Sequence, residues 1–514
     1  MSTDENPDLL QPLNTASPNP EPDSLFSSNH LKRDLKGRSV RGGAITIGAQ
    51  GLKFILILVS NVVLARLLTP VDYGLVGMVT AVMGFVTLFK DLGLSMATVQ
   101  KADINHVQVS TLFWVNLVFS LIATLITIAI APLIAQFYGE PRLVWITIAL
   151  AIGIIIGGLG VQHTALLTRQ MHYKALMLND ILAQLLGVSA AIIAALFGFQ
   201  YWALVLLPLV TACFTTLGVW IACPWQPSWP RWKSGIRSML AFGSHVTGFS
   251  VVDYFALNLD NVLIGKFWGQ QELGLYSKAY QLLLLPISQI NAPITNVAVP
   301  LLSRLTDSPD RYREIYLRIL EKVILVTLPI VLFMIATSDW LIQVLLGSQW
   351  LEASPIFVLL GISGLLRPVA NSTGWLFISQ GRTHELFRWG VISSTLTVLS
   401  FCVGLPWQAK GVATAYSITL LGITIPLLLW FVGRKGPVRT RDFYKTITPL
   451  GIAAIGSIAV LVGFRQTVTL EPILGCCAGF VITNLSFFTG LLVLPKGRSI
   501  VLDLRKIVSE LKAA

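Results

Sequence analysis

Long apolar runs separated by short polar stretches recur along almost the whole chain. A hydrocarbon core roughly 30 Å thick requires about 20 apolar residues for each helical crossing, so runs of this length count as candidate transmembrane helices. Their approximate bounds are 44–67, 74–99, 107–135, 143–168, 175–198, 201–222, 238–265, 273–302, 323–347, 355–380, 389–406, 411–433, 446–464 and 472–494. The pattern predicts an all-α polytopic membrane protein with about 14 transmembrane helices.

The composition favours the same class. The 514 residues are 54% hydrophobic and 12% charged, which does not describe an ordinary soluble domain. Residues 1–30 are rich in Pro, Asn, Ser and Asp and lack an apolar signal-peptide core, so they predict a disordered cytoplasmic tail. Residues 496–514 have apolar positions at helical spacing and predict an amphipathic tail on the cytoplasmic surface.

The formal charge of +12 raises the alternative of nucleic-acid binding, and the placement of the basic residues argues against it. With Met1 in the cytoplasm, most of the 37 Lys and Arg residues lie in the tails and in the loops on that side. The opposite loops hold only Arg66, Arg142, Lys266, Lys410 and Arg465. This is the positive-inside distribution, so both termini are expected in the cytoplasm and no nucleic acid is expected as a partner.

An internal repeat appears at an offset of 200 residues. Residues 61–75 align with residues 261–275, and four of the fifteen positions are identical. Both copies fall at the outer end of an odd-numbered run, with six runs between them, so the two halves have the same orientation in the membrane. The repeat predicts two pseudo-symmetric six-helix lobes, followed by two helices without a counterpart.

The predicted organisation follows from this repeat and from a segment with three prolines, CPWQPSWPRWKSG, which excludes regular helix. The expected units are the tail 1–30, an N-lobe at 31–222, a linker at 223–237, a C-lobe at 238–433, a helix pair at 434–495 and the cytoplasmic tail 496–514.

Charged residues inside the apolar runs are the strongest functional signal, because an ionised side chain at the bilayer midplane costs about 2.5 to 3.5 kcal/mol on insertion scales. Seven of them are candidates for a substrate cavity: Lys53, Lys90, Asp91, Asp253, Asp260, Lys278 and Arg367. Asp180 and His163 lie near the ends of runs, and for these two we favour a structural role.

The repeat relates some of these charges to one another. Asp253 aligns with Lys53, and Asp260 lies seven residues after Asp253 on the same helical stripe. Opposite charges at equivalent positions of two lobes are tolerated in a water-filled cleft and not in lipid. We therefore expect the first two helices of each lobe to line a cleft.

The same charged residues also allow a purely structural interpretation. Lys90 and Asp91 would then form a local pair at a helix break, and Asp260 and Lys278 would extend to the outer boundary of the membrane. Pro368 follows Arg367 directly, which predicts a break in that helix because proline removes a backbone hydrogen bond.

No catalytic constellation is present. The chain lacks the GxxxxGK[ST] phosphate loop, and its five cysteines lie in or beside apolar runs without the spacing of a zinc site. The outer loops leave little room for an active-site domain. A transporter that is not an enzyme, without a metal or a cofactor, is the simplest remaining class.

Four segments also resemble a known family, the polysaccharide-export, or Wzx-like, flippases of the MOP (multidrug, oligosaccharidyl-lipid and polysaccharide) exporter superfamily. The resemblance extends over about residues 37 to 435 and is nearest to the colanic-acid and lipopolysaccharide exporters. It is carried by LARLLTPVDYGL (64–75), LFKDLGLSMATVQ (88–100), NLDNVLIGKFWGQQELGLYSKAYQLLLLP (258–286) and LLSRLTDSPDRYREIYLR (301–318).

The resemblance implies an inner-membrane protein whose two lobes form a V around a cavity that opens alternately to each side. Such proteins move undecaprenyl-diphosphate-linked oligosaccharide units to the outer leaflet for O-antigen, capsule or exopolysaccharide assembly. The implied partners are the lipid-linked oligosaccharide and membrane lipids, with a polysaccharide polymerase and glycosyltransferases as further candidates. The resemblance also implies coupling to H⁺ or Na⁺.

In this scheme the bases Lys53, Lys90 and Arg367 capture the diphosphate. The carboxylates Asp91, Asp253 and Asp260 pair with these bases in the empty state or bind the coupling cation. Two alternatives stay open: a cation-coupled small-molecule (multidrug) exporter, and a non-transporting scaffold for polysaccharide synthesis.

Overall fold

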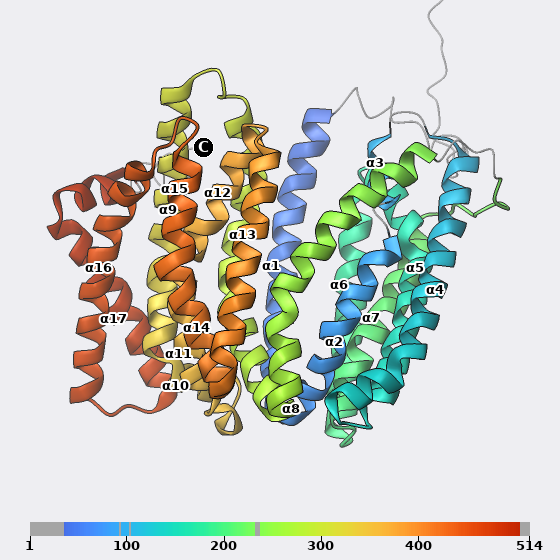
Figure 1. Cartoon of the computed structure of the whole chain (residues 1–514), viewed down its shortest axis with the longest axis horizontal. Coiled ribbons are helices and arrows are strands. Elements are labelled where there is room, and N and C mark those ends of the chain that lie inside the picture. Colours follow the sequence, from blue (N-terminus) through green and yellow to red (C-terminus); the bar gives the residue numbers. More distant parts are fainter. Residues whose placement is uncertain (1–34, 92–93, 102–103, 232–236, 504–514) are drawn as a thin grey trace, which may run out of the picture.

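The computed structural model describes residues 35–91, 94–101, 104–231 and 237–503, and it leaves out the side chains of residues 35–47, 49, 88–91, 237–253 and 255–257. Helices running up and down form a single broad bundle (Figure 1). Among the described residues, twelve helices are long and apolar enough to cross a membrane. The predicted all-α polytopic class is confirmed. The tail at 1–30 lies outside the described residues.

The N-terminal half of the bundle contains six long helices and one short one. They are α1 (Leu35–Leu67), α2 (Pro70–Asp91), α3 (Leu94–Gln100), α4 (His106–Tyr138), α5 (Leu143–Arg169), α6 (Tyr173–Leu196) and α7 (Tyr201–Ala222). The apolar run expected at 74–99 is thus divided between α2 and α3. Helix α4 ends at Gly139, whose φ of 73° is a left-handed conformation that glycine adopts without steric cost.

The C-terminal half contains α8 (Arg237–Ser303), α9 (Pro309–Ala336), α10 (Ser338–Leu345), η3 (Ser348–Trp350), α11 (Ala353–Gly364), α12 (Arg367–Ser379), α13 (Thr383–Gly404), η4 (Leu405–Trp407), α14 (Gln408–Thr419), η5 (Leu420–Thr424) and α15 (Ile425–Gly433). Helix α8 reverses at Gly269, where φ is 80°, so its two halves run in opposite directions. The break predicted at Pro368 is confirmed, since α11 ends at Gly364 and α12 starts at Arg367.

Two further helices, α16 (Thr440–Thr467) and α17 (Pro472–Val493), complete the bundle. They pack against α9 and α10 at the edge that is farthest from the N-terminal half (Figure 1). Residues 495–503 continue as helix, with Ile500 buried. Residues 504–514, the rest of the expected amphipathic tail, lie outside the described residues.

The proline-rich linker contains no helix over residues 223–231, as its three prolines predict. It docks on α4: Ser228 N donates to the Ser110 hydroxyl at 3.1 Å, and Trp229 stacks on Trp114 with ring centroids 5.5 Å apart. These contacts fix the exit of the chain from the N-terminal half.

The two repeat copies meet face to face. A Cβ atom at Gly74 would lie 1.7 Å from the Gln270 carbonyl oxygen, and one at Gly274 would lie 1.9 Å from the Pro70 carbonyl oxygen. Residues 74 and 274 correspond in the repeat, and so do residues 70 and 270. This reciprocal contact, which we name the glycine crossing, is the arrangement that a twofold axis between two parallel repeats produces.

Replacing Gly274 with Leu is expected to separate the two halves at the glycine crossing, because even a Cβ atom has no room there. The fully buried Ala65 then becomes reachable. The measurement is labelling of an Ala65→Cys reporter in the purified protein by a water-soluble maleimide, with the five native cysteines replaced. Loss of about 1.4 kcal/mol from the closed state gives tenfold more of the open state, and labelling rises accordingly.

The matched control is Gly456→Leu, since a Cβ atom at Gly456 meets nothing within 4 Å. Equal labelling rates for the two leucine variants would contradict the role of the glycine crossing.

Candidate functional site

A cavity of about 490 Å³ lies between the two halves. Helices α1, α2, α6 and α7 line it from one half, and the second part of α8 lines it from the other. Polar side chains gather on this lining, and they include Ser60, Asn61, Thr80, Gln184, Ser277 and Gln281. An inter-lobe cavity with a polar wall is therefore present. Helices α1, α2 and the second part of α8 were expected on its wall, whereas α6 and α7 were not, and no described residue of the first part of α8 lies on it.

Lys278 is the single charged side chain among the described residues that line this cavity. Its ammonium donates to Asn61 Oδ1 at 2.8 Å and lies 4.2 Å from the centroid of the Tyr73 ring, and both partners belong to the opposite half. Lys278 is 2% exposed, so its side chain lies inside the protein and does not extend to solvent. Its charge is compensated by an amide oxygen and an aromatic face and by no carboxylate, which leaves it able to bind an anion.

One end of the cavity is sealed by basic side chains that cross between the halves. Arg66 donates to the Val344 carbonyl in the last turn of α10, and Lys266 donates to the Phe137 carbonyl in the last turn of α4. Residues 66 and 266 correspond in the repeat, and each cation meets the negative end of a helix. We name this pair the basic latch.

Two side chains from η3 strengthen the seal at the same end. Trp350 Nε1 donates to the Ala65 carbonyl at 2.8 Å, and Gln349 Nε2 donates to the carbonyls of Ala65 and Leu68 at 2.7 and 3.0 Å. Tyr73 packs edge-on against Trp350 with ring centroids 5.3 Å apart. The backbone carbonyls at the end of α1 thus bind side chains of the other half.

A buried polar network lies inside the C-terminal half. The Asp260 carboxylate accepts hydrogen bonds from the Tyr276 hydroxyl at 2.9 Å and from Asn261 N at 2.8 Å. Arg367 donates to the hydroxyls of Tyr280 at 2.6 Å and Tyr416 at 3.4 Å. Asp260 is 2% exposed, and it forms no ion pair with another described residue.

The described hydrogen bonds of these residues differ from the expected charge pairs. Asp260 bonds to a tyrosine, and Arg367 bonds to two tyrosines. Lys53 pairs with Asp180 of α6 at 3.2 Å, because α1 packs on α6 and turns Lys53 toward that helix. None of the three lies on the described wall of the inter-lobe cavity. Roles for Lys53, Asp260 and Arg367 in transport stay predictions.

The side chains of Lys90, Asp91 and Asp253 lie outside the described residues, so their predicted place in the cavity stays a prediction. His163 is fully buried, bonds the Trp225 carbonyl at 3.1 Å and stacks on Trp220. It joins α5 to the linker. Within the described ranges, no group of three or more His, Cys, Asp or Glu side chains is placed to hold a metal ion.

The sequence did not reveal the uncharged residues of the inter-lobe cavity or of the buried polar network in the C-terminal half. Asn61, Tyr73, Tyr276, Tyr280 and Tyr416 carry no charge and are ordinary residues in a membrane helix. Asn61 had a usable signal, since it is one of the four identical positions of the repeat.

Comparison with known proteins agrees with the motifs. The family model described as "Polysaccharide biosynthesis protein" matches residues 63–355. The chain belongs to this family. The family resemblance expected from the four segments is thereby confirmed, and the expected class, a transporter and not an enzyme, agrees with it.

Individual relatives are more distant. The chain is 29% identical over 307 residues to the teichuronic acid biosynthesis protein TuaB of Bacillus subtilis (strain 168), covering 59% of this chain and 64% of that protein. It is thus aligned to less than two thirds of TuaB. It is 24% identical over 407 residues to the lipopolysaccharide biosynthesis protein WzxC of Escherichia coli (strain K12), covering 79% of this chain and 82% of WzxC.

Among solved structures, the lipid II flippase MurJ in an inward closed conformation matches with a TM-score of 0.71 at 14% identity. The match covers 88% of this chain and 98% of MurJ. The chain therefore has the same fold as MurJ.

Replacing Tyr276 with Phe is expected to destabilise the protein by about 1 to 3 kcal/mol, because the buried Asp260 carboxylate loses a donor. The measurement is unfolding of the purified protein by titration with sodium dodecyl sulfate. Tyr444→Phe is the matched control, since Tyr444 is 47% exposed and should change the midpoint little. Equal midpoints for Tyr276→Phe and wild type would exclude this contact as a source of stability.

Proposed function

We propose that the protein is a flippase that moves undecaprenyl-diphosphate-linked oligosaccharide units across the inner membrane, for O-antigen, capsule or exopolysaccharide assembly. The observation that carries the proposal is the inter-lobe cavity with Lys278 on its wall and a seal at one end. Family membership and the names of TuaB and WzxC support a polysaccharide pathway. The resemblance of the motifs favours the colanic-acid and lipopolysaccharide branch.

The chemistry of the cavity suits a phosphate ester linked to sugars. A buried ammonium forms charge-assisted hydrogen bonds with phosphate oxygens, and the diphosphate is a stronger acceptor than the Asn61 amide that Lys278 binds in the empty protein. Amide and hydroxyl groups along α1, α2 and α8 offer both donors and acceptors to sugar hydroxyls. The polyprenyl tail remains in the bilayer.

The proposed topology has fourteen crossings with both termini in the cytoplasm. Two of the apolar helical stretches, Asn258–Ser303 and Thr383–Gly433, have 46 and 51 residues, and each is long enough for two crossings. The described chain begins and ends at the same end of the bundle (Figure 1). The positive-inside rule assigns that end to the cytoplasm. The basic latch then faces the exterior, and the structure represents an inward-facing state.

Transport then proceeds by alternating access. Substrate enters from the cytoplasmic side, contacts Lys278, and competes with the Asn61 and Tyr73 contacts that hold the two halves together. Opening to the exterior requires release of the basic latch and the glycine crossing. A coupling ion, H⁺ or Na⁺, supplies the bias for return, and Asp260 is a buried carboxylate on α8, the helix that also carries Lys278.

Two alternatives are separated by direct tests. A multidrug exporter would change drug susceptibility in a deletion strain and leave surface polysaccharide intact. A non-transporting scaffold, serving a polymerase and glycosyltransferases, would tolerate loss of the Lys278 charge. We favour the flippase because a sealed, polar inter-lobe cavity has no use in a scaffold.

Replacing Lys278 with Gln is expected to reduce export of surface polysaccharide at least about tenfold, since a hydrogen bond to a charged group contributes roughly 1.5 to 3 kcal/mol. The assay complements a deletion strain at equal protein level and quantifies surface polysaccharide. Lys174→Gln, at an exposed lysine outside the cavity, is the control. Export at the wild-type level from the Lys278 variant would refute its role.

Replacing Lys53 or Arg367 with Ala is also expected to lower export in the same assay, because each change removes a charge that we predict to take part in transport. Lys53→Arg keeps the ion pair with Asp180 and should keep export. If the alanine variants export normally at equal protein level, Lys53 and Arg367 have no part in the mechanism.

A further inference from the structure

A second cavity, of about 400 Å³, shares no lining residue with the inter-lobe cavity. It lies between the beginning of α9, the beginning of α16 and residues 496–500, which follow α17. Its wall is mixed. It has three bases, two hydroxyl groups, two carboxylates and an apolar part, namely Arg313, Lys445, Lys496, Thr446, Ser499, Glu321, Asp442, Leu317, Pro449 and Ile500.

Both carboxylates of this wall already have cationic partners. Asp442 accepts hydrogen bonds from the Arg313 guanidinium and, at 2.9 Å, from Arg439 N. Glu321 accepts from Lys322 at 2.9 Å. The side-chain ammonium groups of Lys445 and Lys496 form no hydrogen bond or ion pair with any residue that the structure describes. The cavity therefore presents two uncompensated positive charges.

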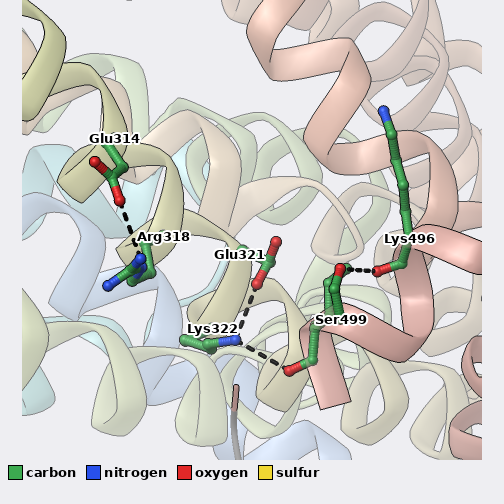
Figure 2. Close-up of polar contacts among 7 residues, drawn as sticks. Glu314, Arg318, Glu321, Lys322, Lys496 and Ser499 are labelled. Carbon is green, nitrogen blue, oxygen red and sulfur yellow. Dashed lines mark hydrogen bonds and ion pairs between the residues drawn. The ribbon is translucent and has the colours of Figure 1, made fainter. Parts of the chain in front are cut away.

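The framework of the cavity is fixed by contacts between elements. Lys322 joins α9 to the segment after α17, because its ammonium also donates to the Ile500 carbonyl at 3.2 Å. Ser499 donates to the Lys496 carbonyl at 2.7 Å and holds the turn closed. Figure 2 shows that the Lys496 side chain extends away from Glu321 and Lys322, so its ammonium is available to a ligand.

We propose that this cavity binds the head group of an anionic phospholipid from the cytoplasmic leaflet. Two lysines supply charge-assisted hydrogen bonds to the phosphate, and Thr446 and Ser499 add hydroxyl groups. Leu317, Pro449 and Ile500 offer an apolar surface to the glycerol and the first acyl carbons. Basic pockets between transmembrane helices on the cytoplasmic side are a recurrent way to bind such lipids.

The position of the site gives the lipid a structural role. Helices α16 and α17 have no counterpart in the repeat, and Arg313 with Asp442 and Lys322 with Ile500 join them to α9. A lipid seated between α9 and α16 adds a further link and stabilises the attachment of this helix pair.

The test measures lipid binding to the delipidated full-length protein by native mass spectrometry, with phosphatidylglycerol and phosphatidylcholine as probes. We expect wild type to prefer phosphatidylglycerol, and the double variant Lys445→Gln, Lys496→Gln to bind it about tenfold to thirtyfold more weakly. A double variant of exposed bases outside the cavity, Lys174→Gln with Arg388→Gln, removes the same charge and should bind like wild type.

Three outcomes would overturn the proposal. The first is equal phosphatidylglycerol binding by wild type and the cavity variant. The second is an equal loss in the control variant, which would indicate a general charge effect. The third is displacement of the lipid by millimolar inorganic phosphate, which would make this a site for free anions. Because the readout is binding, a failure here leaves the export proposal untouched.

Discussion

The inter-lobe cavity depends on a contact in which backbone lies directly against backbone. At the glycine crossing, Gly74 meets the Gln270 carbonyl and Gly274 meets the Pro70 carbonyl, so no side chain separates the two halves there. The basic latch lies at the same end and places Arg66 and Lys266 on the free carbonyls of two helix ends. Each such charge–dipole contact contributes only about 0.3 to 1 kcal/mol. The two halves thus contact each other closely at this end, while each charge–dipole contact contributes little free energy. A gate requires this combination, because it must close tightly and still open.

The polar groups of the bundle fall into two classes that serve different purposes. Asp260 and Arg367 bond to tyrosine hydroxyls inside the C-terminal half, so their charges are held by partners that move with them. Lys278 instead bonds to Asn61 and Tyr73 across the boundary. A buried hydrogen bond within one half survives a rigid-body rotation, whereas one between halves must be exchanged for another partner. In the proposed mechanism, Lys278 is accordingly the described buried base whose hydrogen bonds change with the state of the transporter.

The sequence predicted the parts of the fold that depend on run length and on backbone chemistry. The membrane-spanning class follows from the thickness of the bilayer. The break at Pro368 and the absence of helix in the linker follow from the missing donor of proline. The partners of the charges were not predictable in the same way. Lys53 and Asp180 are 127 residues apart, and which helix α1 turns toward is decided by packing. Lipid and protein interior are equally apolar, so an apolar stripe does not distinguish the two faces of such a helix.

The helix pair α16 and α17 bears on how the halves can move. It packs on α9 and α10, and no contact with α1 or α2 is among the main packing pairs of the described helices. Arg465 of α16 bonds to Asp339 of α10 at 2.6 Å, and Lys322 holds the opposite end of the pair to α9. With an attachment at both ends, the pair is joined to the C-terminal half as part of one packed unit. In the proposed mechanism, reorientation then requires rearrangement where α1, α2 and α4 meet α8, α10 and η3, and this is where the glycine crossing, the basic latch and Lys278 are found.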